Sequence, residues 1–267
     1  MTADFDLAAY LARIGLAAPP DPTAAGLAAL HLAHATHVPF ENLDVLLGRP
    51  IRLDPESLQR KLVRDRRGGY CFEQNLLFAA ALEAVGFRAT RLAARVRYRA
   101  NRTLARTHML LAVEADGGPW LADVGFGGSG PLLPLRLAAG VEQQQFLWAY
   151  RLAAEGGAWV LQGRVPSGWQ DFYAFTLEPQ ELVDYEVANY YVSTHPDSPF
   201  TRTLTAQLPA PEARHLLRNR ELTVERATGP ETRTVADGEL PDVLARLFGL
   251  TVPPGTTLPD RPWAWGS

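Results

Sequence analysis

Apolar side chains recur at the spacing of an α-helix through the first part of the chain. Leu7, Tyr10 and Leu11 would share one helix face, and Gly15 can end that helix. Thr23 can cap a second helix that follows a proline-rich connector. The expected helices span residues 7–14, 24–35 and 71–85, with a further one starting at 54.

The pattern changes after residue 87, where short apolar or alternating segments are bounded by Gly, Pro, Asp and Asn. Such segments are typical of β-strands. The expected strands span residues 90–98, 107–115, 120–124, 146–152, 159–162 and 172–177. Five aromatic residues of this region are expected to form its core: Trp159, Trp169, Phe172, Tyr173 and Phe175.

A helix is expected to start near residue 178, and the rest of the chain mixes both kinds of element. Strands are expected at 202–206, 221–226 and 231–235, and a helix at 240–248, before a Pro- and Gly-rich end. No internal repeat divides the chain. The order of helices, then strands, then a mixture indicates an α+β protein.

Composition narrows the class of protein further. The 267 residues can form one large domain or two to three small ones, and the net charge of −3 gives no sign of binding to nucleic acid or an anionic membrane. A single cysteine excludes an intrachain disulfide and favours a reducing compartment. The acidic start does not resemble a secretory signal, and no apolar run is long enough to span a bilayer. We therefore expect a cytoplasmic protein.

The surroundings of that single cysteine, Cys71, favour chemistry over simple packing. Cys71 follows Arg67-Gly68-Gly69-Tyr70 and begins an expected helix. The glycines allow a tight turn with the backbone close to a ligand. The partial positive charge of a helix N-terminus stabilises a thiolate, and its N–H groups can stabilise an oxyanion. Cys71 is therefore the candidate nucleophile.

A cysteine nucleophile needs a base, and the base needs an acceptor that orients it. His108 and Asp123 lie on two expected strands joined by Asp116-Gly117, a dipeptide typical of tight hairpins. If these two residues form the turn, His108 pairs with Gly125, and Asp123 lies on the same face two residues away. A three-residue turn without a bulge would separate the two side chains. The alternative is then a surface histidine and an aspartate near a turn.

Residues 125–130 match the dinucleotide-binding pattern G-x-G-x-x-G, and they follow a strand. That pattern binds NAD or FAD only where it opens a helix. Here Pro131 and Pro134 follow, which disfavour a helix at this point. The motif therefore predicts a glycine-rich turn and no dinucleotide site.

Three histidines, His31, His34 and His37, occur three residues apart in the second expected helix. At this spacing they fan over more than one helix face, and no cysteine or carboxylate is placed to complete a metal site. We therefore expect packing or helix-end roles for them, and no metal.

Five motifs together resemble those of the arylamine N-acetyltransferases. They are VPFENL at 38–43, RGGYCFEQN at 67–75, THML at 107–110, DVGFG at 123–127 and STHP at 193–196, in the family's order and spacing. The resemblance implies an N-terminal helical bundle over 1–86 that carries the nucleophile. It also implies a central β-barrel over 87–190 that carries the histidine and the aspartate, and a C-terminal α/β lid over 191–267. The catalytic core would be papain-like.

The resemblance implies Cys71 as nucleophile, His108 as its base and Asp123 as the acid that orients the histidine. The thiolate would take an acetyl group from acetyl-CoA and pass it to an arylamine, an N-hydroxyarylamine or a hydrazine, by a ping-pong route. The implied partners are CoA and a small acceptor, and the protein would be a monomer or a homodimer.

Further site residues follow from the same resemblance. The acceptor pocket would be lined by Phe40, Val96, Phe126 and Phe200, and the pantetheine arm of CoA would lie against Thr107, Gly125 and Gly127. Simple core packing is the alternative role for Phe40 and Val96.

Three other functions stay open on the sequence. The first is an amide synthase that releases a polyketide chain from a carrier-bound acyl thioester. The second is a papain-like or transglutaminase-like enzyme, because the order Cys, His, Asp and the thiolate chemistry are shared. The third is a non-enzymatic protein with an inert, buried Cys71.

Overall fold

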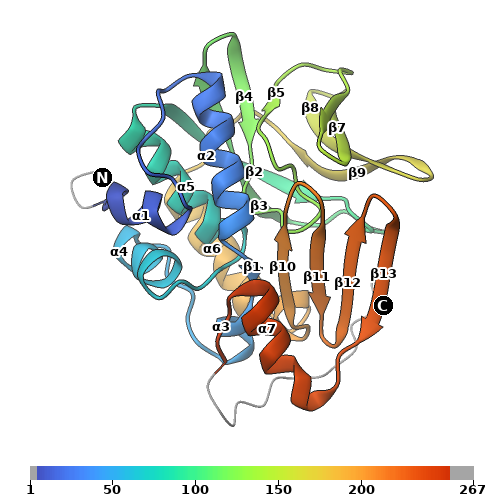
Figure 1. Cartoon of the computed structure of the whole chain (residues 1–267). Helices are drawn as coiled ribbons and strands as arrows, with labels where there is room; N and C mark the ends of the chain where they lie inside the picture. The colour runs from blue at the N-terminus through green and yellow to red at the C-terminus, as the bar shows by residue number, and fades with distance from the viewer. Residues whose placement is uncertain (1–4, 253–267) are drawn as a thin grey trace.

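The computed structural model describes residues 5–252, which form two antiparallel sheets with helices beside them (Figure 1). Residues 1–4, which include Asp4 of the acidic start, and the Pro- and Gly-rich end at residues 253–267 lie outside the described residues.

The N-terminal part is helical, as expected. It contains α1 (Leu7–Arg13), α2 (Ala24–His37), α3 (Leu43–Leu46), α4 (Pro55–Leu58), a π-helix η1 (Gln59–Arg64) and α5 (Cys71–Val85). The side chains of Asp6, Thr23 and Asp54 cap α1, α2 and α4 by accepting backbone N–H groups. Gly86 ends α5 with a left-handed φ of 106°. Helix α3 and the π-helix were not expected from the sequence pattern.

The middle of the chain forms an eight-stranded sheet that almost closes on itself. Its strands are β2 (Arg88–Val96), β3 (Arg106–Ala115), β4 (Gly118–Ala122), β5 (Leu135–Arg136), β6 (Gln143–Gln145), β7 (Trp148–Glu155), β8 (Ala158–Val165) and β9 (Gly168–Phe175). Their order is β5-β4-β3-β2-β9-β8-β7-β6. The two edge strands meet through Gln143, whose side chain accepts from the N–H of Arg136 at 2.8 Å and donates to its carbonyl at 3.2 Å. This sheet is the expected barrel.

Aromatic and leucine side chains fill the interior of the barrel, including Phe172, Tyr173 and Phe175, and Trp159 packs against them. The prediction for Trp169 is wrong. Its ring lies beneath two guanidinium groups, 4.4 Å from that of Arg151 and 5.2 Å from that of Arg164. Trp169 is only half-buried and does not belong to the side chains packed in the barrel core, so its ring contacts arginines instead.

The C-terminal part adds α6 (Leu182–Thr194), η2 (Pro199–Thr201), β10 (Thr205–Pro209), β11 (Arg214–Arg218), β12 (Glu221–Arg226), β13 (Gly229–Thr234), η3 (Asp237–Glu239) and α7 (Leu240–Phe248). Its sheet has the order β1-β10-β11-β12-β13, so the edge strand β1 (Phe40–Glu41) comes from the N-terminal part of the chain. Figure 1 shows this sheet below the barrel, with α7 beside it. The expected α+β class is confirmed, whereas the boundaries at 86 and 190 stay a prediction.

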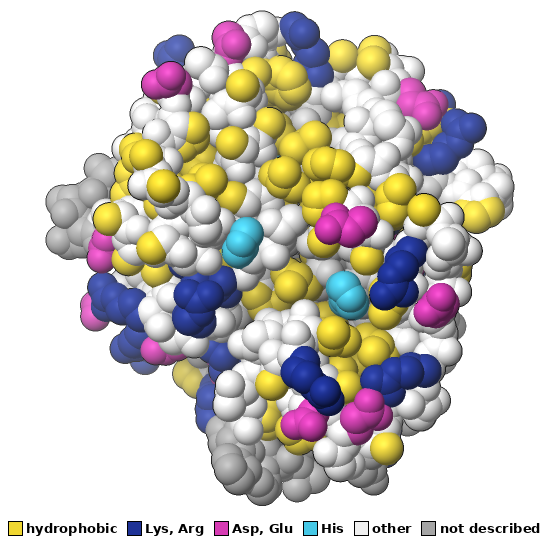
Figure 2. Space-filling model, in the orientation of Figure 1, with side chains coloured by type: hydrophobic (Ala, Val, Ile, Leu, Met, Phe, Trp, Pro, Cys, Tyr) yellow, Lys and Arg dark blue, Asp and Glu magenta, His cyan; other side chains and the backbone are white. Residues whose placement is uncertain are grey.

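On the face seen in Figure 2, positive and negative side chains are interspersed, with hydrophobic side chains between them. Among the described residues, no helix is both long and apolar enough to cross a membrane.

Two histidines of α2 lie entirely inside the protein. His34 shares a hydrogen bond of 2.9 Å with the hydroxyl of Tyr10, and the ring of Phe78 packs edge-on against it at 5.4 Å. Burial lowers the pKa of His31 to about 4 and that of His34 to about 3. Both rings are therefore neutral at pH 7.

These lowered pKa values predict that the protein loses stability in mild acid. The unfolded chain takes up protons near pH 6.5, while the folded protein does not until about pH 4 or below. The free energy of unfolding should therefore fall by on the order of 2 kcal/mol per histidine between pH 7 and pH 5. Urea titrations at both pH values measure this loss. His34→Gln should show a smaller loss than the wild type, and the exposed His195→Gln the same loss as the wild type; equal losses in all three proteins would contradict the prediction.

Candidate active site

The hairpin of β3 and β4 brings His108 and Asp123 together. The two strands pair from Leu111 with Ala122 to Ala115 with Gly118, so the turn contains only Asp116 and Gly117. This is the register that the sequence analysis required. Nε2 of His108 lies 2.7 Å from Oδ2 of Asp123, and both side chains are almost fully buried.

Cys71 is the first residue of α5 and lies against the same hairpin. Its thiol donates to the carbonyl of Thr107 at 3.6 Å, next to His108 in the chain. On the other side, the loop after β4 touches the backbone of Cys71. A Cβ on Gly125 would lie 2.7 Å from the Cys71 Cα and 2.6 Å from Nδ2 of Asn75. Only glycine fits at this contact.

The electrostatics of the site favour a charged pair of His108 and Asp123. Burial alone would lower the pKa of His108, but the Asp123 carboxylate and the adjacent Cys71 outweigh it and raise the pKa above the ordinary value. Burial alone would raise the pKa of Asp123, but His108 and two N–H donors lower it. A histidine that stays protonated beside a cysteine stabilises the thiolate. The arrangement can therefore act as an activated nucleophile.

Asn75 ties together the three segments that carry these residues. It lies one turn after Cys71 on α5, and its Nδ2 donates to Oδ1 of Asp123 at 3.0 Å and to the carbonyl of Met109 at 2.7 Å. Its Oδ1 accepts from the N–H of Val124 at 3.2 Å. Asn75 was not predicted as a site residue, although its i+4 spacing from Cys71 places it on the same face of α5.

His31 holds Asp123 from the opposite side. The N–H of Asp123 donates to its Nε2 at 3.1 Å, so the proton of the neutral ring lies on Nδ1, which donates to the carbonyl of Leu132 at 2.9 Å. His31 therefore does more than the packing that was expected, because it also hydrogen-bonds the backbone of Asp123. His34 instead meets Tyr10, and His37 bonds the carbonyl of Ala33. Within residues 5–252, no three His, Cys, Asp or Glu side chains gather as a metal site would require.

Aromatic side chains surround the three residues. The ring of Phe126 lies 5.3 Å from that of His108, and the ring of Tyr173 lies 4.8 Å from it. Tyr173 lies in the barrel core, as expected, and its contact with His108 was not predicted. No pattern in the sequence indicated that contact.

A second aromatic group lies next to Tyr70, the residue before Cys71. The ring of Phe200 lies 5.7 Å from that of Tyr70 and 5.9 Å from that of Phe40. Gly127 faces the same group, because a Cβ there would lie 3.4 Å from the Phe40 ring. Val96 ends β2 as the partner of Tyr173 and is partly exposed. Their roles in binding stay a prediction.

The glycine-rich turn at 125–130 lies between the two sheets. After it the chain enters β5 and not a helix, as the prolines indicated. The N–H of Gly128 donates to Oε1 of Gln207 on β10 at 2.7 Å. Arg214 of β11 contacts the carbonyl of Ser129 at 3.4 Å and stacks on Trp148 of the barrel at 3.9 Å. The turn therefore joins the C-terminal sheet to the site.

Comparison with known proteins places this site in a family. The family model described as N-acetyltransferase matches residues 23–256. The chain is 43% identical over 254 residues to the arylamine N-acetyltransferase of Mycobacterium tuberculosis, covering 92% of this chain and 90% of that protein. The chain belongs to the arylamine N-acetyltransferase family.

Other arylamine N-acetyltransferases agree in sequence and in fold. The chain is 45% identical over 199 residues to the Salmonella typhimurium protein named arylamine N-acetyltransferase / N-hydroxyarylamine O-acetyltransferase, covering 74% of this chain and 71% of that one. The solved M. tuberculosis structure matches with a TM-score of 0.89, covering 91% of this chain and 93% of that one. The Mycobacterium marinum structure in complex with CoA matches with a TM-score of 0.87 at 43% identity, covering 91% and 92%.

The contact between Gly125 and α5 predicts a sensitive position in this member of the family. In Gly125→Ala, the added methyl group would overlap backbone atoms of Cys71, so α5 or the loop must shift. We expect the variant to lose about 1–3 kcal/mol of stability and at least tenfold in the alkylation rate of Cys71. Gly238→Ala, where a Cβ meets nothing within 4 Å, is the control. Wild-type alkylation and melting in Gly125→Ala would show that the contact is not constraining.

Proposed function

We propose that this protein transfers an acetyl group from acetyl-CoA to an arylamine, an N-hydroxyarylamine or a hydrazine, with an acetylated Cys71 as the intermediate. The observation that carries the proposal is the buried pair of His108 and Asp123, 2.7 Å apart, beside a cysteine at a helix start. The family's name and the CoA bound in the M. marinum relative support the donor and the acceptor class.

In the first half-reaction the Cys71 thiolate attacks the carbonyl carbon of acetyl-CoA. The resulting oxyanion lies at the N-terminus of α5, where the helix dipole and the N–H groups of the first turn favour negative charge. The carbon–sulfur bond to CoA then breaks, and protonated His108 gives its proton to the leaving thiolate. One thioester replaces another, so this step is nearly balanced in free energy.

In the second half-reaction the acceptor nitrogen attacks the acetyl-cysteine. His108 takes the proton that the nitrogen loses, and the carbon–sulfur bond to Cys71 breaks to restore the thiolate. An arylamine is neutral at pH 7 and therefore has a free electron pair for this attack. Asp123 keeps the proton of the ring on Nε2, so that Nδ1 can accept a proton at the reacting side.

The aromatic side chains around the site favour a flat, apolar acceptor. Phe126 lies beside His108, and Phe40 and Phe200 lie beside the turn that carries Cys71. Rings of this kind bind an aromatic amine by stacking and edge contacts. We assign Phe40, Val96, Phe126 and Phe200 to the acceptor and Thr107, Gly125 and Gly127 to the pantetheine arm of CoA.

The first test asks whether acetyl-CoA acetylates Cys71. Intact-mass measurement after mixing should show one added acetyl group on the wild type and none on Cys71→Ala. Adding an arylamine should remove the group and release the acetylated amine. Turnover of arylamine by Cys71→Ala would refute the proposal. A wild type that ignores acetyl-CoA but accepts a carrier-bound acyl thioester would indicate the amide synthase instead.

The second test concerns the orientation of His108. In Asp123→Asn the amide donates to Nε2, which moves the ring proton to the side that must accept one. We expect the acetylation rate of Cys71 to fall by about 10²-fold or more, with the fold retained by circular dichroism. Asp242→Asn, an exposed aspartate of α7, is the matched control. Near-normal turnover in Asp123→Asn would remove the aspartate from the mechanism.

A further inference from the structure

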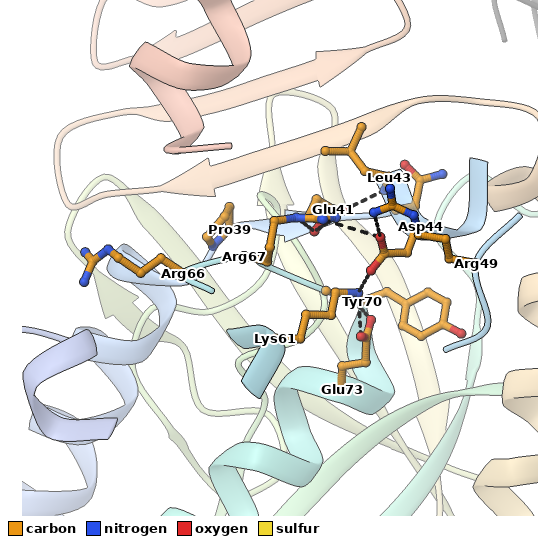
Figure 3. A network of polar contacts seen from close by, with 12 residues as sticks. Pro39, Glu41, Leu43, Asp44, Arg49, Lys61, Arg66, Arg67, Tyr70 and Glu73 are labelled. Carbon is orange, nitrogen blue, oxygen red and sulfur yellow. Dashed lines mark hydrogen bonds and ion pairs between the residues drawn. The ribbon is translucent and has the colours of Figure 1, made fainter. Parts of the chain in front are cut away.

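A network of buried charges surrounds Arg67 and Tyr70, which belong to the turn that leads to Cys71 (Figure 3). Glu73, the third residue of α5, has only 2% of its side chain exposed, and Glu41 of β1 has none. Lys61 of the π-helix and Arg67 of the turn are the cations inside the network, with 18% and 16% exposed. Asp44 of α3 completes it with 13% exposed. Such buried charges are tolerated only when each has a partner.

Glu73 connects this network to the nucleophile. Its Oε2 accepts the N–H of Tyr70 at 3.1 Å and so caps the first turn of α5, one residue before Cys71. The carboxylate lies so close to the turn that a Cβ on Gly69 would be 2.5 Å from Oε2. This contact explains the second glycine of the RGGYC motif. The position of Glu73 therefore fixes the start of the helix.

Lys61 holds the other oxygen of Glu73. Its Nζ lies 2.7 Å from Oε1 of Glu73 and 2.9 Å from Oδ2 of Asp44. Burial alone would lower the pKa of Lys61, but the carboxylates of Glu73, Glu41 and Asp44 raise it, so the ammonium keeps its charge. Burial raises the pKa of Glu73, and Lys61 opposes that rise. Without Lys61 the carboxylate would tend to take up a proton or turn away from the cap.

The main chain of Lys61 is joined to the same turn. The N–H of Arg67 donates to the Lys61 carbonyl at 3.0 Å. Lys61 belongs to a π-helix, an irregular element that is often retained at functional sites. It is also the only lysine in the chain. Both its backbone and its side chain therefore meet the segment that leads to Cys71.

We propose that Lys61 is a positioning residue for Cys71. It holds the buried carboxylate of Glu73 against the N–H of Tyr70 and thereby fixes the thiol relative to His108, which comes from a different element. This inference rests on the proposed function. A shift of about 1 Å in the nucleophile is enough to slow a reaction of this kind strongly.

The test is a double-mutant cycle of Lys61→Gln, Glu73→Gln and the double variant. We expect Lys61→Gln to slow single-turnover acetylation of Cys71 at least tenfold at saturating acetyl-CoA. The double variant should recover to within about threefold of the wild type, because the two new amides can pair with each other and position 73 no longer carries a buried charge. Asp44 keeps Arg67 and Arg49, each at 3.4 Å, and the amide oxygen at position 73 can still accept the N–H of Tyr70. Arg49→Gln is the matched control, since Arg49 also contacts Asp44, at 3.4 Å, but is 53% exposed and remote from the cap.

Iodoacetamide alkylation across pH, together with thermal melting, separates positioning from stability alone. The alkylation profile of Lys61→Gln should move to higher pH and that of the double variant should return. A lowered melting temperature with wild-type acetylation and alkylation would overturn the proposal. If Lys61→Gln does not fold, a folded double variant that acetylates slowly would also overturn it. If wild-type Cys71 takes no acetyl group, the proposed function fails, while the alkylation comparison still tests Lys61.

Discussion

The close contact between Gly125 and the first turn of α5 is the constraint on which the rest of the site depends. It brings the loop after β4 against the backbone of Cys71, closer than any side chain would permit. Asn75 can then bond Asp123, Val124 and Met109 from the helix, which locks helix, loop and strand into one arrangement. Cys71, His108 and Asp123 come from different elements, and they meet because the backbone of the loop after β4 can approach that of α5 this closely.

The site and its surroundings also hold two groups of charges away from water. His108 and Asp123 form one buried pair, and the network around Lys61 and Glu73 forms a second group at the turn that leads to Cys71. Desolvation opposes each of these charges, and each is retained through a direct partner. His31 is neutral, so it accepts the N–H of Asp123 without adding a further buried charge. Burial lowers the pKa of His31 and so keeps its ring neutral.

Local chemistry made part of this arrangement predictable. The turn at Asp116 and Gly117 set the hairpin register, and that register alone placed His108 and Asp123 on one face. The helix at 240–248 and the strand at 221–226 were predicted with their observed bounds, since apolar spacing and turn residues mark them clearly. Strands β1, β5 and β6 were missed because two or three residues carry no detectable period, and β11 was missed because its buried positions do not alternate. Trp169 was misplaced because aromatic content does not show which face of a strand carries arginines.

The sequence by itself determined the order of elements, the position of Cys71 at a helix start and the hairpin that pairs His108 with Asp123. These depend on short-range rules of turns, caps and periodicity, together with motifs that resemble one family. Only the tertiary structure decided that His31 and Asn75 hold Asp123, that Phe200 packs against Phe40 and Tyr70, and that Lys61 supports the cap of α5. Apart from the Asn75–Asp123 and Lys61–Glu73 pairs, those contacts join residues about 90 or more positions apart. No local pattern encodes contacts of that kind, because they arise from how whole elements pack.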